Sequence, residues 1–319
     1  MMSYPDFSQK QVLFLASQDT KDISFQNDNL LVRENGKKVN QVPCSKIFAL
    51  FIFGECTLTT VLIRKFTSYG IAIFLLKRNC QTFAAIGSQT EGNTLLRRKQ
   101  YEEKNSLEIA KHLIANKLQN QILLLRSVRS EESFGHKQIA ESIENILKDV
   151  PNAPDIASLM GMEGSGAKLF FSCYFFGLGW HGRKPRTKYD IPNLLLDIGY
   201  TYMFNFVDAL LRLYGFDTYC GNLHQEFYLR KSLACDIVEP FRCIIDKALR
   251  KAWNLKQVNE KDFTIHQGQY VLKFEQGYKY SRVFLEAIMA EKEGIFKFVQ
   301  SYYRTIMNGK SELPTFTPA

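Results

Sequence analysis

The sequence predicts an α+β protein, in which a small N-terminal β-rich domain is joined by a linker to a larger, mainly α-helical domain. Short apolar runs separated by turn signals fill the first part of the chain, a pattern typical of strands. From about residue 95, apolar residues recur instead at helical spacing. Residues 87–93 are small and polar, as linkers are. We therefore expect the domains at residues 1–88 and 95–319, with the linker at residues 89–94.

One continuous apolar run marks the centre of the β-rich domain. Residues 47–54 read Ile-Phe-Ala-Leu-Phe-Ile-Phe-Gly, which is typical of a strand buried on both faces. Upstream, Asn35-Gly36 is a strong signal for a tight turn between two strands. This part of the chain contains no histidine and few polar groups that could converge. We interpret it as a scaffold or interface domain and expect the chemistry in the helical domain.

The charge balance favours a polyanionic partner. The chain has 319 residues, of which 45% are hydrophobic, and 41 basic against 32 acidic residues give a net charge of +9. Nucleic acid is the first candidate for such a partner and an acidic membrane surface the second, although many metabolic enzymes are equally basic. Charge alone therefore indicates a class of partner without deciding it.

Cysteine usage and the lack of an apolar span indicate a cytoplasmic protein, and three common functional motifs are absent from the sequence. The 7 cysteines include no Cys-x-x-Cys pair, which suits reduced thiols in a cytosol. The sequence opens with no charged-then-apolar leader and contains no run of eighteen apolar residues, so we expect a cytoplasmic protein without a membrane span. Neither a phosphate-binding loop, nor a nucleophile elbow, nor zinc spacing occurs.

One histidine and two acids form the first candidate site. Ser232 can cap a helix on which Asp236 and Glu239, three residues apart, share a face. His224 lies just before that helix. An imidazole with two carboxylates suits a hard divalent cation such as Mg²⁺ or Mn²⁺. The alternative is a solvated helix face with local ion pairs, which is the commoner meaning of such spacing.

A third acid lies in a glycine-containing helical segment. Glu163 is followed by Gly164 and Gly166, and each glycine inside a helix costs about 1 kcal/mol relative to alanine. Such a cost suggests that the backbone approaches another element closely. Glu163 is then either part of a site or a surface residue at a loose helix start.

A basic loop precedes the longest predicted helix. Arg183, Lys184, Arg186 and Lys188 gather around Pro185. Flexible basic loops contact phosphates well, and they are equally often plain solvated loops. The loop alone leaves both interpretations open.

Several of these segments occur together in the order and spacing of one known family. They are Met162-Glu163-Gly164, Arg183-Lys-Pro-Arg, Asp190-Ile-Pro-Asn, Gly221-Asn-Leu-His224 and the stretch from Ser232 to Arg242. In these segments the chain resembles the CRISPR adaptation integrase, a metal-dependent DNA endonuclease that inserts new spacers into the repeat array. The likeness covers nearly the whole chain, including the β-rich part.

The resemblance implies a set of site residues. Glu163, His224 and Glu239 fall on the metal-ligand positions, where they would hold Mg²⁺ or Mn²⁺, and Asp236 falls on a supporting catalytic acid. The helical domain would then be the catalytic one. The candidates for DNA contact are Arg183, Lys184, Arg186, Arg230 and Arg242. Pro240 stands where the family commonly has a second Glu, and we expect it to bend or reset the helix because it lacks a backbone donor.

The resemblance also implies an activity and partners. A 3′-hydroxyl of spacer DNA would attack a phosphodiester at the repeat by transesterification. The implied partners are double-stranded DNA (spacer precursor and repeat array), a second copy of the chain joined through the β-rich domains, and a small ferredoxin-like adaptation protein. Two other functions stay open at this point: a repair nuclease for branched DNA, and a non-catalytic DNA-binding scaffold.

Overall fold

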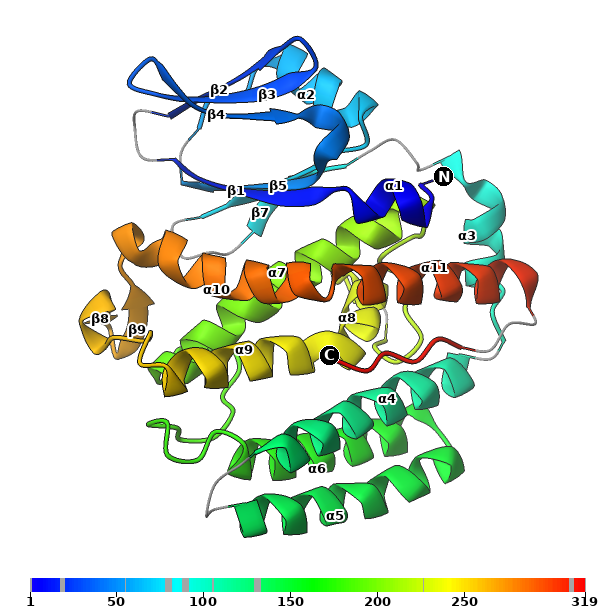
Figure 1. Ribbon diagram of the computed structural model, residues 1–319. Helices are drawn as coiled ribbons and strands as arrows, with labels where there is room; N and C mark the ends of the chain where they lie inside the picture. The colour runs from blue at the N-terminus through cyan, green and yellow to red at the C-terminus, as the bar shows by residue number, and fades with distance from the viewer. Residues whose placement is uncertain are drawn as a thin grey trace.

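The computed structural model places a strand-rich N-terminal part against a larger helical part, which confirms the predicted fold class (Figure 1). It describes residues 2–17, 21–54, 56–77, 82–87, 92–104, 106–128, 133–225, 227–309 and 313–318. Residues 89–91 of the predicted linker lie outside the described residues. The domain boundaries therefore stay a prediction.

The N-terminal part contains two sheets. The larger has the order β1-β5-β6-β7, with β1 and β6 parallel to β5 and β7 antiparallel to β6. The smaller is the antiparallel meander β2-β3-β4. The strands are β1 (Gln11–Ser17), β2 (Lys21–Gln26), β3 (Asn29–Glu34), β4 (Lys37–Pro43), β5 (Ile47–Gly54), β6 (Ala72–Leu76) and β7 (Thr82–Ile86), with helix α1 (Tyr4–Ser8) before them, the 3-10 turn η1 (Cys44–Lys46) before β5 and helix α2 (Thr60–Ser68) after it.

Two sequence predictions about these sheets are confirmed. Asn35 and Gly36 both have positive φ angles in the turn between β3 and β4, as a tight hairpin turn requires. Strand β5 lies between β1 and β6 and is buried along almost its whole length. Its Leu50 packs into the core shared with the smaller sheet, whereas its Phe51 packs toward the helical part. The uninterrupted apolar run is therefore explained by burial on both faces.

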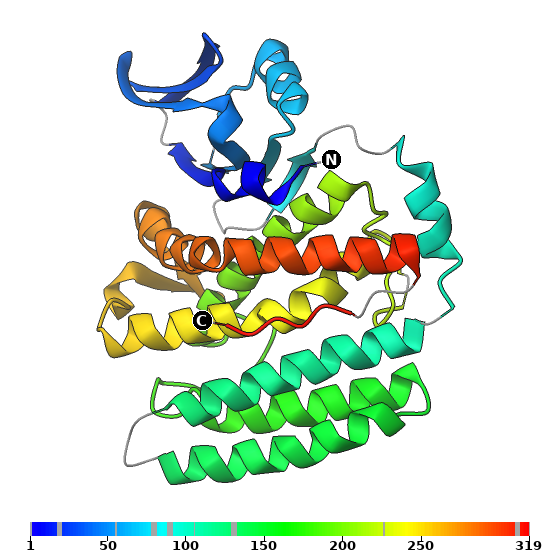
Figure 2. The ribbon, with the colours of Figure 1, turned by 45° about the vertical axis from the view of Figure 1, so that its right-hand side comes forward.

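The helical part is built in layers below the larger sheet (Figures 1 and 2). Helices α7, α10 and α11 lie next to the sheet, α8 and α9 lie below them, and α4, α5 and α6 form the layer farthest from the sheets. The bounds are α3 (Thr94–Tyr101), α4 (Ser106–Ser127), α5 (Ser133–Asp149), α6 (Ile156–Cys173), α7 (Ile191–Tyr214), α8 (Ser232–Val238), α9 (Arg242–Asn254), α10 (Gly277–Ala290) and α11 (Lys292–Asn308), with 3-10 turns η3 (Val150–Asn152), η4 (Glu239–Phe241), η5 (Glu260–Asp262) and η6 (Phe274–Gln276) and the hairpin β8 (Phe263–His266) and β9 (Gln269–Leu272).

Helix α7 is the core helix of this part. The Asp190 side chain caps its start by accepting from the Asn193 amide at 2.7 Å, and Gly215, with φ of 91°, ends it. By length and composition alone α7 could cross a membrane, but 83% of its apolar window is buried inside the protein. Packing against α8, α9 and α10 accounts for the apolar composition.

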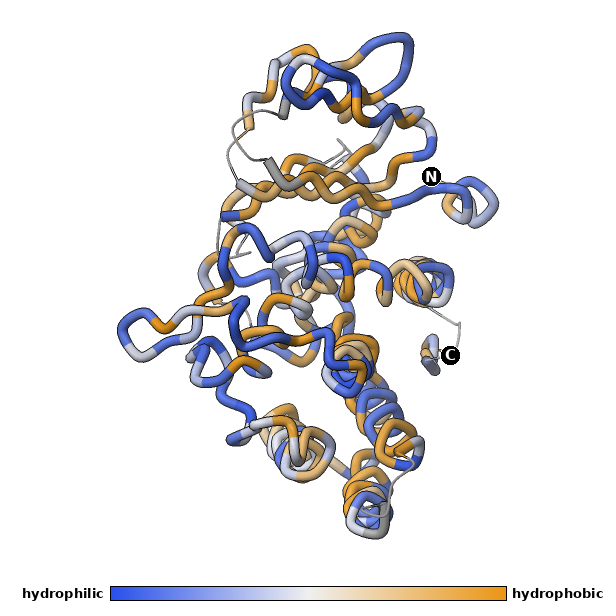
Figure 3. Tube along the Cα trace, turned by 60° about the vertical axis from the view of Figure 1, so that its left-hand side comes forward, coloured by the Kyte–Doolittle hydropathy of each residue, from blue (hydrophilic) through white to orange (hydrophobic). Residues whose placement is uncertain are grey.

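One hydrophobic core joins the larger sheet to the helices. Phe51 of β5 packs edge-on against Tyr202 of α7, with ring centroids 5.8 Å apart, and Phe48 packs in the same way against Phe206. In Figure 3 the strands at this junction are hydrophobic along their length, whereas the outer turns are hydrophilic. The sheet therefore fixes the position of α7 by packing against it. Helix α7 in turn contacts α8 and α9, which flank part of the candidate site.

Two of the three glycines of α6, Gly164 and Gly166, have different surroundings. A Cβ added at Gly166 would collide with Leu118 of α4, whereas one at Gly164 would meet no atom within 4 Å. The predicted close backbone approach is thus confirmed at Gly166, where it allows α6 to lie tightly against α4. Gly164 has no such role in packing.

This difference predicts opposite effects of alanine at the two positions. Gly164→Ala should raise the free energy of unfolding by up to about 1 kcal/mol, because alanine is the better helix former. Gly166→Ala gains the same helical term but must displace a buried leucine, so we expect it to be about 2 kcal/mol less stable than Gly164→Ala. Urea unfolding of both variants measures the contrast, and equal stabilities would contradict the close approach.

Candidate functional site

Two of the predicted acids meet at a buried lysine. The ammonium of Lys117, on α4, hydrogen-bonds to Oε1 of Glu163, on α6, and to Oε2 of Glu239, on η4, the latter at 2.6 Å. Because they share one Nζ, the two carboxylate oxygens lie within about 6 Å of each other. Burial alone would lower the pKa of Lys117, but the two acids raise it above its ordinary value. The lysine therefore stays charged between them.

Glu239 is held by a second cation. Arg242 donates from Nε and Nη2 to the two carboxylate oxygens, both at 2.9 Å, in a two-pronged pair. Burial would raise the pKa of Glu239, but the charges of Arg242 and Lys117 outweigh it and hold that pKa well below its usual range. Glu239 is thus a permanent anion at neutral pH.

His224 is oriented by Asp236. The fully buried Asp236 carboxylate accepts the backbone amides of Asn222, Leu223 and His224 at 2.5 to 3.0 Å, and it accepts Nδ1 of the His224 ring at 2.7 Å. A Cβ at Gly221 would collide with this carboxylate, which explains the glycine that opens the loop. Since Nδ1 faces Asp236, Nε2 is the atom that His224 can offer to a ligand.

The helix around these acids differs from the prediction in two ways. Ser232 is the first helical residue and does not cap α8; its hydroxyl donates instead to the Gln225 carbonyl, and Lys231 occupies the cap position. Asp236 and Glu239 do not act on one face, because α8 ends at Val238 and a 3-10 turn follows. Each acid therefore serves its own partners.

The 3-10 turn confirms the expected effect of Pro240. The turn η4 contains that proline and separates α8 from α9, so the backbone is reset there. The side-chain amide of Asn120, one turn after Lys117 on α4, donates to the Pro240 carbonyl at 2.9 Å. This bond ties the turn that carries Glu239 to the helix that carries the lysine.

The three predicted metal ligands are brought together only in part. Glu163 and Glu239 share one cation, whereas His224 is held by Asp236. In the described residues no three His, Cys, Asp or Glu side chains are gathered closely enough to hold a metal ion. The donor chemistry nevertheless fits Mg²⁺ or Mn²⁺, because two carboxylates converge on one positive charge and Asp236 orients an imidazole ring that precedes Glu239 in the chain. The ligand set stays a prediction.

The basic candidates fall into two groups. Arg183 is tied down by Asp197 at 2.7 Å, and its guanidinium and that of Arg242 both lie over the ring of Tyr200, at 5.5 and 4.7 Å. The others are exposed to solvent; they are Lys184, Arg186 and Arg230. The Lys184 ammonium lies over the exposed ring of Tyr189, at 3.6 Å. The exposed group can reach a ligand from solvent, whereas Arg183 and Arg242 first have to leave, or share, their ion-pair partners.

Sequence reasoning gave no role to three residues of this network, Lys117, Tyr200 and Asp246. Lys117 is buried at the centre of it, and Tyr200 donates to the buried Asp246 at 2.5 Å. The signal for Lys117 was present, since it lies four residues after Leu113 and three after Ile114, on the apolar face of α4. A charged residue on a core face requires a partner of opposite charge.

Asp246 predicts a dependence of stability on pH. Burial raises its pKa to about 7, against the opposing effects of Tyr200 and the nearby cations. From about pH 4 to pH 7 the folded state holds a proton that the unfolded state has lost, so the free energy of unfolding falls as pH rises. Asn cannot lose a proton in this range, so Asp246→Asn should not show this fall. The free energy of unfolding of the variant minus that of the original chain should therefore increase by about 2 to 3 kcal/mol between pH 5 and pH 8. A difference that does not change with pH would contradict the raised pKa.

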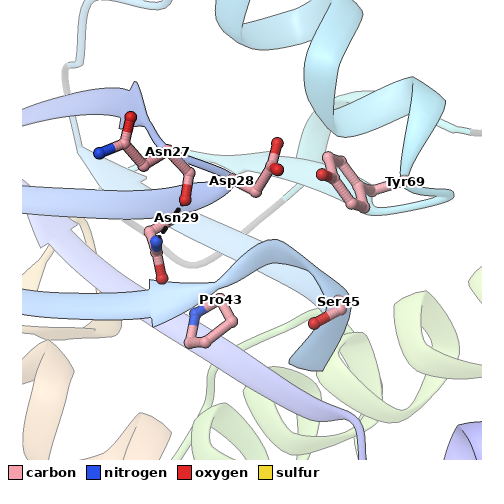
Figure 4. Close-up of a pocket in the computed structure, with 6 residues that line it drawn as sticks. All are labelled: Asn27, Asp28, Asn29, Pro43, Ser45 and Tyr69. Atoms are coloured by element: carbon pink, nitrogen blue, oxygen red, sulfur yellow. Dashed lines mark hydrogen bonds between the residues drawn. The ribbon is translucent and has the colours of Figure 1, made fainter.

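A pocket elsewhere does not compete as a metal centre. It has a volume of about 410 Å³ and lies on the β-rich part, where Asp28 faces Tyr69 (Figure 4). Its lining residues are Asn27, Asp28, Asn29, Pro43, Ser45 and Tyr69. The pocket has a single carboxylate, that of Asp28, whereas two carboxylates converge at Lys117.

The comparisons with known proteins decide the family. A sequence model of the family described as CRISPR associated protein Cas1 matches residues 13–286. The chain belongs to the Cas1 family. A Cas1 endonuclease of Thermodesulfovibrio yellowstonii is 30% identical over 258 residues, which cover 77% of this chain and 81% of the relative. A second relative, a Cas1 endonuclease of Rhodospirillum rubrum, is 30% identical over 272 residues, with 79% and 78% covered.

Solved structures agree with this fold. A Cas1 protein of Thermotoga maritima superposes with a TM-score of 0.79 at 20% identity, covering 95% of this chain and 99% of that one. A casposase bound to integration product gives 0.80 at 19% identity, with 97% and 94% covered. A chain of a Cas6-RT-Cas1–Cas2 complex gives 0.79 at 22% identity; the present chain is 98% covered but spans only 36% of that longer chain. At these identities the likeness shows the Cas1 fold.

Proposed function

We propose that this Cas1-family chain is a metal-dependent DNA endonuclease and integrase that inserts spacer DNA into a CRISPR repeat array. The observation that carries the proposal is the meeting of Glu163 and Glu239 at one cation, with His224 oriented by Asp236 on the adjoining element. The curated relatives are named endonucleases, and one structural neighbour is a casposase with its integration product. The names of the relatives support DNA cutting, and that of the structural neighbour supports integration.

The proposed ion is Mg²⁺ or Mn²⁺, held by Glu163, Glu239 and Nε2 of His224. Such an ion, when bound, neutralises charge on the attacked phosphate and increases the acidity of the attacking hydroxyl. Asp236 fixes the His224 ring so that Nε2 is its accepting nitrogen. Arg242 keeps Glu239 ionised and in one orientation. In the transfer a 3′-hydroxyl of the spacer forms the new phosphodiester, and a 3′-hydroxyl of the target strand leaves.

The same proposal covers partners. The net charge of +9 and the exposed Lys184, Arg186 and Arg230 suit the phosphates of double-stranded DNA. A solved complex of a Cas1 protein with DNA and the Cas6-RT-Cas1–Cas2 complex support DNA and a second adaptation protein as partners, which we propose is small and ferredoxin-like. We further propose that the chain works as a homodimer in the cytoplasm.

A joining assay tests the function. Labelled DNA with free 3′-hydroxyl ends is mixed with a plasmid that carries a repeat, Mn²⁺ and the protein, with the partner protein added in a parallel reaction. We expect label in the plasmid at the repeat ends. Cutting of branched DNA without joining would favour a repair nuclease. DNA binding without either reaction, unchanged by Glu163→Ala or His224→Ala, would favour a scaffold.

A further inference from the structure

The buried cation at the candidate centre has no role in the chemistry proposed above. The side chain of Lys117 is 7% exposed and that of Glu239 is 5% exposed, whereas that of Glu163 is 26% exposed. With Arg242, the cluster holds two positive and two negative side chains. It is therefore neutral and already paired.

A divalent cation cannot simply be added to this arrangement. Glu239 already accepts two bonds from Arg242 and one from Lys117, which leaves little of its carboxylate free. An added ion would also bring four positive charges against two negative ones in a buried site, where charge repulsion is only weakly screened. The ammonium and the ion therefore exclude each other.

We propose that Lys117 is a built-in counter-ion that holds Glu163 and Glu239 together in the metal-free protein, and that a divalent cation takes its place between them. This inference rests on the proposed function, since it concerns the same centre. The carboxylate of Glu163, which is partly open to solvent, provides the side from which the ion approaches. The flexible stem of the lysine allows the ammonium to withdraw without a change in α4. The lysine keeps two acids from repelling each other until the ion arrives.

Mn²⁺ affinity of the DNA-free protein tests the exchange. The free ion is followed by electron paramagnetic resonance and the heat of binding by calorimetry, so no activity is needed. Lys117→Met and Lys117→Gln remove the competing charge, and each should bind Mn²⁺ at least about 10-fold more tightly than the original chain. Lys117→Arg keeps the charge and should not show the gain. The matched control is Lys111→Met, which removes a lysine of the same helix that pairs with Glu108.

The possible outcomes distinguish the proposed replacement of Lys117 by an ion from the proposed metal-dependent function. If the original chain binds Mn²⁺ and the uncharged variants bind it no more tightly, the exchange is wrong and the metal-dependent function stands. If no variant binds Mn²⁺, both fail. The gain in Lys117→Gln should disappear when Glu163→Gln is added, and a gain that persists would place the ion elsewhere and overturn the exchange. Lys117→Gln keeps an amide that donates to the carboxylates, so it serves if Lys117→Met does not fold.

Discussion

Glu163→Gln is expected to reduce DNA cutting and joining by at least about 10²- to 10³-fold while the protein stays folded. The substitution keeps the size of the side chain but removes one of the two negative charges that we propose hold the ion. Glu163 is partly exposed, and Lys117 keeps Glu239 as its second partner, so the protein should stay folded although one charge of a partly buried ion pair is lost. Both rates are measured with Mn²⁺ in excess, and melting temperature reports the fold.

Glu108→Gln provides the control for this experiment. Glu108 also pairs with a lysine, Lys111, but on the exposed side of α4. We expect this variant to cut and join DNA at the original rate. Full activity of Glu163→Gln would remove Glu163 from the catalytic centre and leave the Lys117 contact as a purely structural one.

Asp236→Ala is expected to have the largest effect on stability, about 3 to 5 kcal/mol, and to abolish activity as well. The buried carboxylate is the common acceptor for three backbone amides and the His224 ring, and alanine would leave all of them without it. The loop that presents the histidine should then lose its shape. Urea unfolding measures the loss directly.

His224→Ala separates the role of the ring from the role of the loop. The His224 ring is partly exposed and, in the described structure, bonds to Asp236 alone, so its removal should cost only about 1 kcal/mol while activity is still lost. The acid would thus be the positioning residue and the histidine the catalytic one. If His224→Ala were as unstable as Asp236→Ala, the two roles could not be distinguished in this way.

The sequence was sufficient where local pattern determines structure. The run of residues 47–54 is apolar at every position before its terminal glycine, and such a run has few stable settings other than a strand covered on both faces. Pro240 likewise acts locally, because a missing donor interrupts a helix whatever surrounds it. The same proline explains why the prediction that Asp236 and Glu239 share a face was wrong, since α-helical spacing does not apply across the 3-10 turn.

The centre itself could not be derived from spacing. Glu163, Glu239 and Lys117 come from α6, η4 and α4, and their meeting depends on how these elements pack. No local rule relates positions 117, 163 and 239; the resemblance to a known family supplied the two acids and left the lysine unnoticed. The ion-pair partners of Lys117 are evident only from the fold, which places both acids at its ammonium group.

Anomalous diffraction from crystals grown with MnCl₂ tests most directly whether Glu163, His224 and Glu239 hold one ion. We predict a single manganese peak within roughly 2.0 to 2.6 Å of a carboxylate oxygen of each glutamate and of Nε2 of His224. A manganese peak at other side chains, or none at these three while Lys117 still bridges the two acids, would contradict the account.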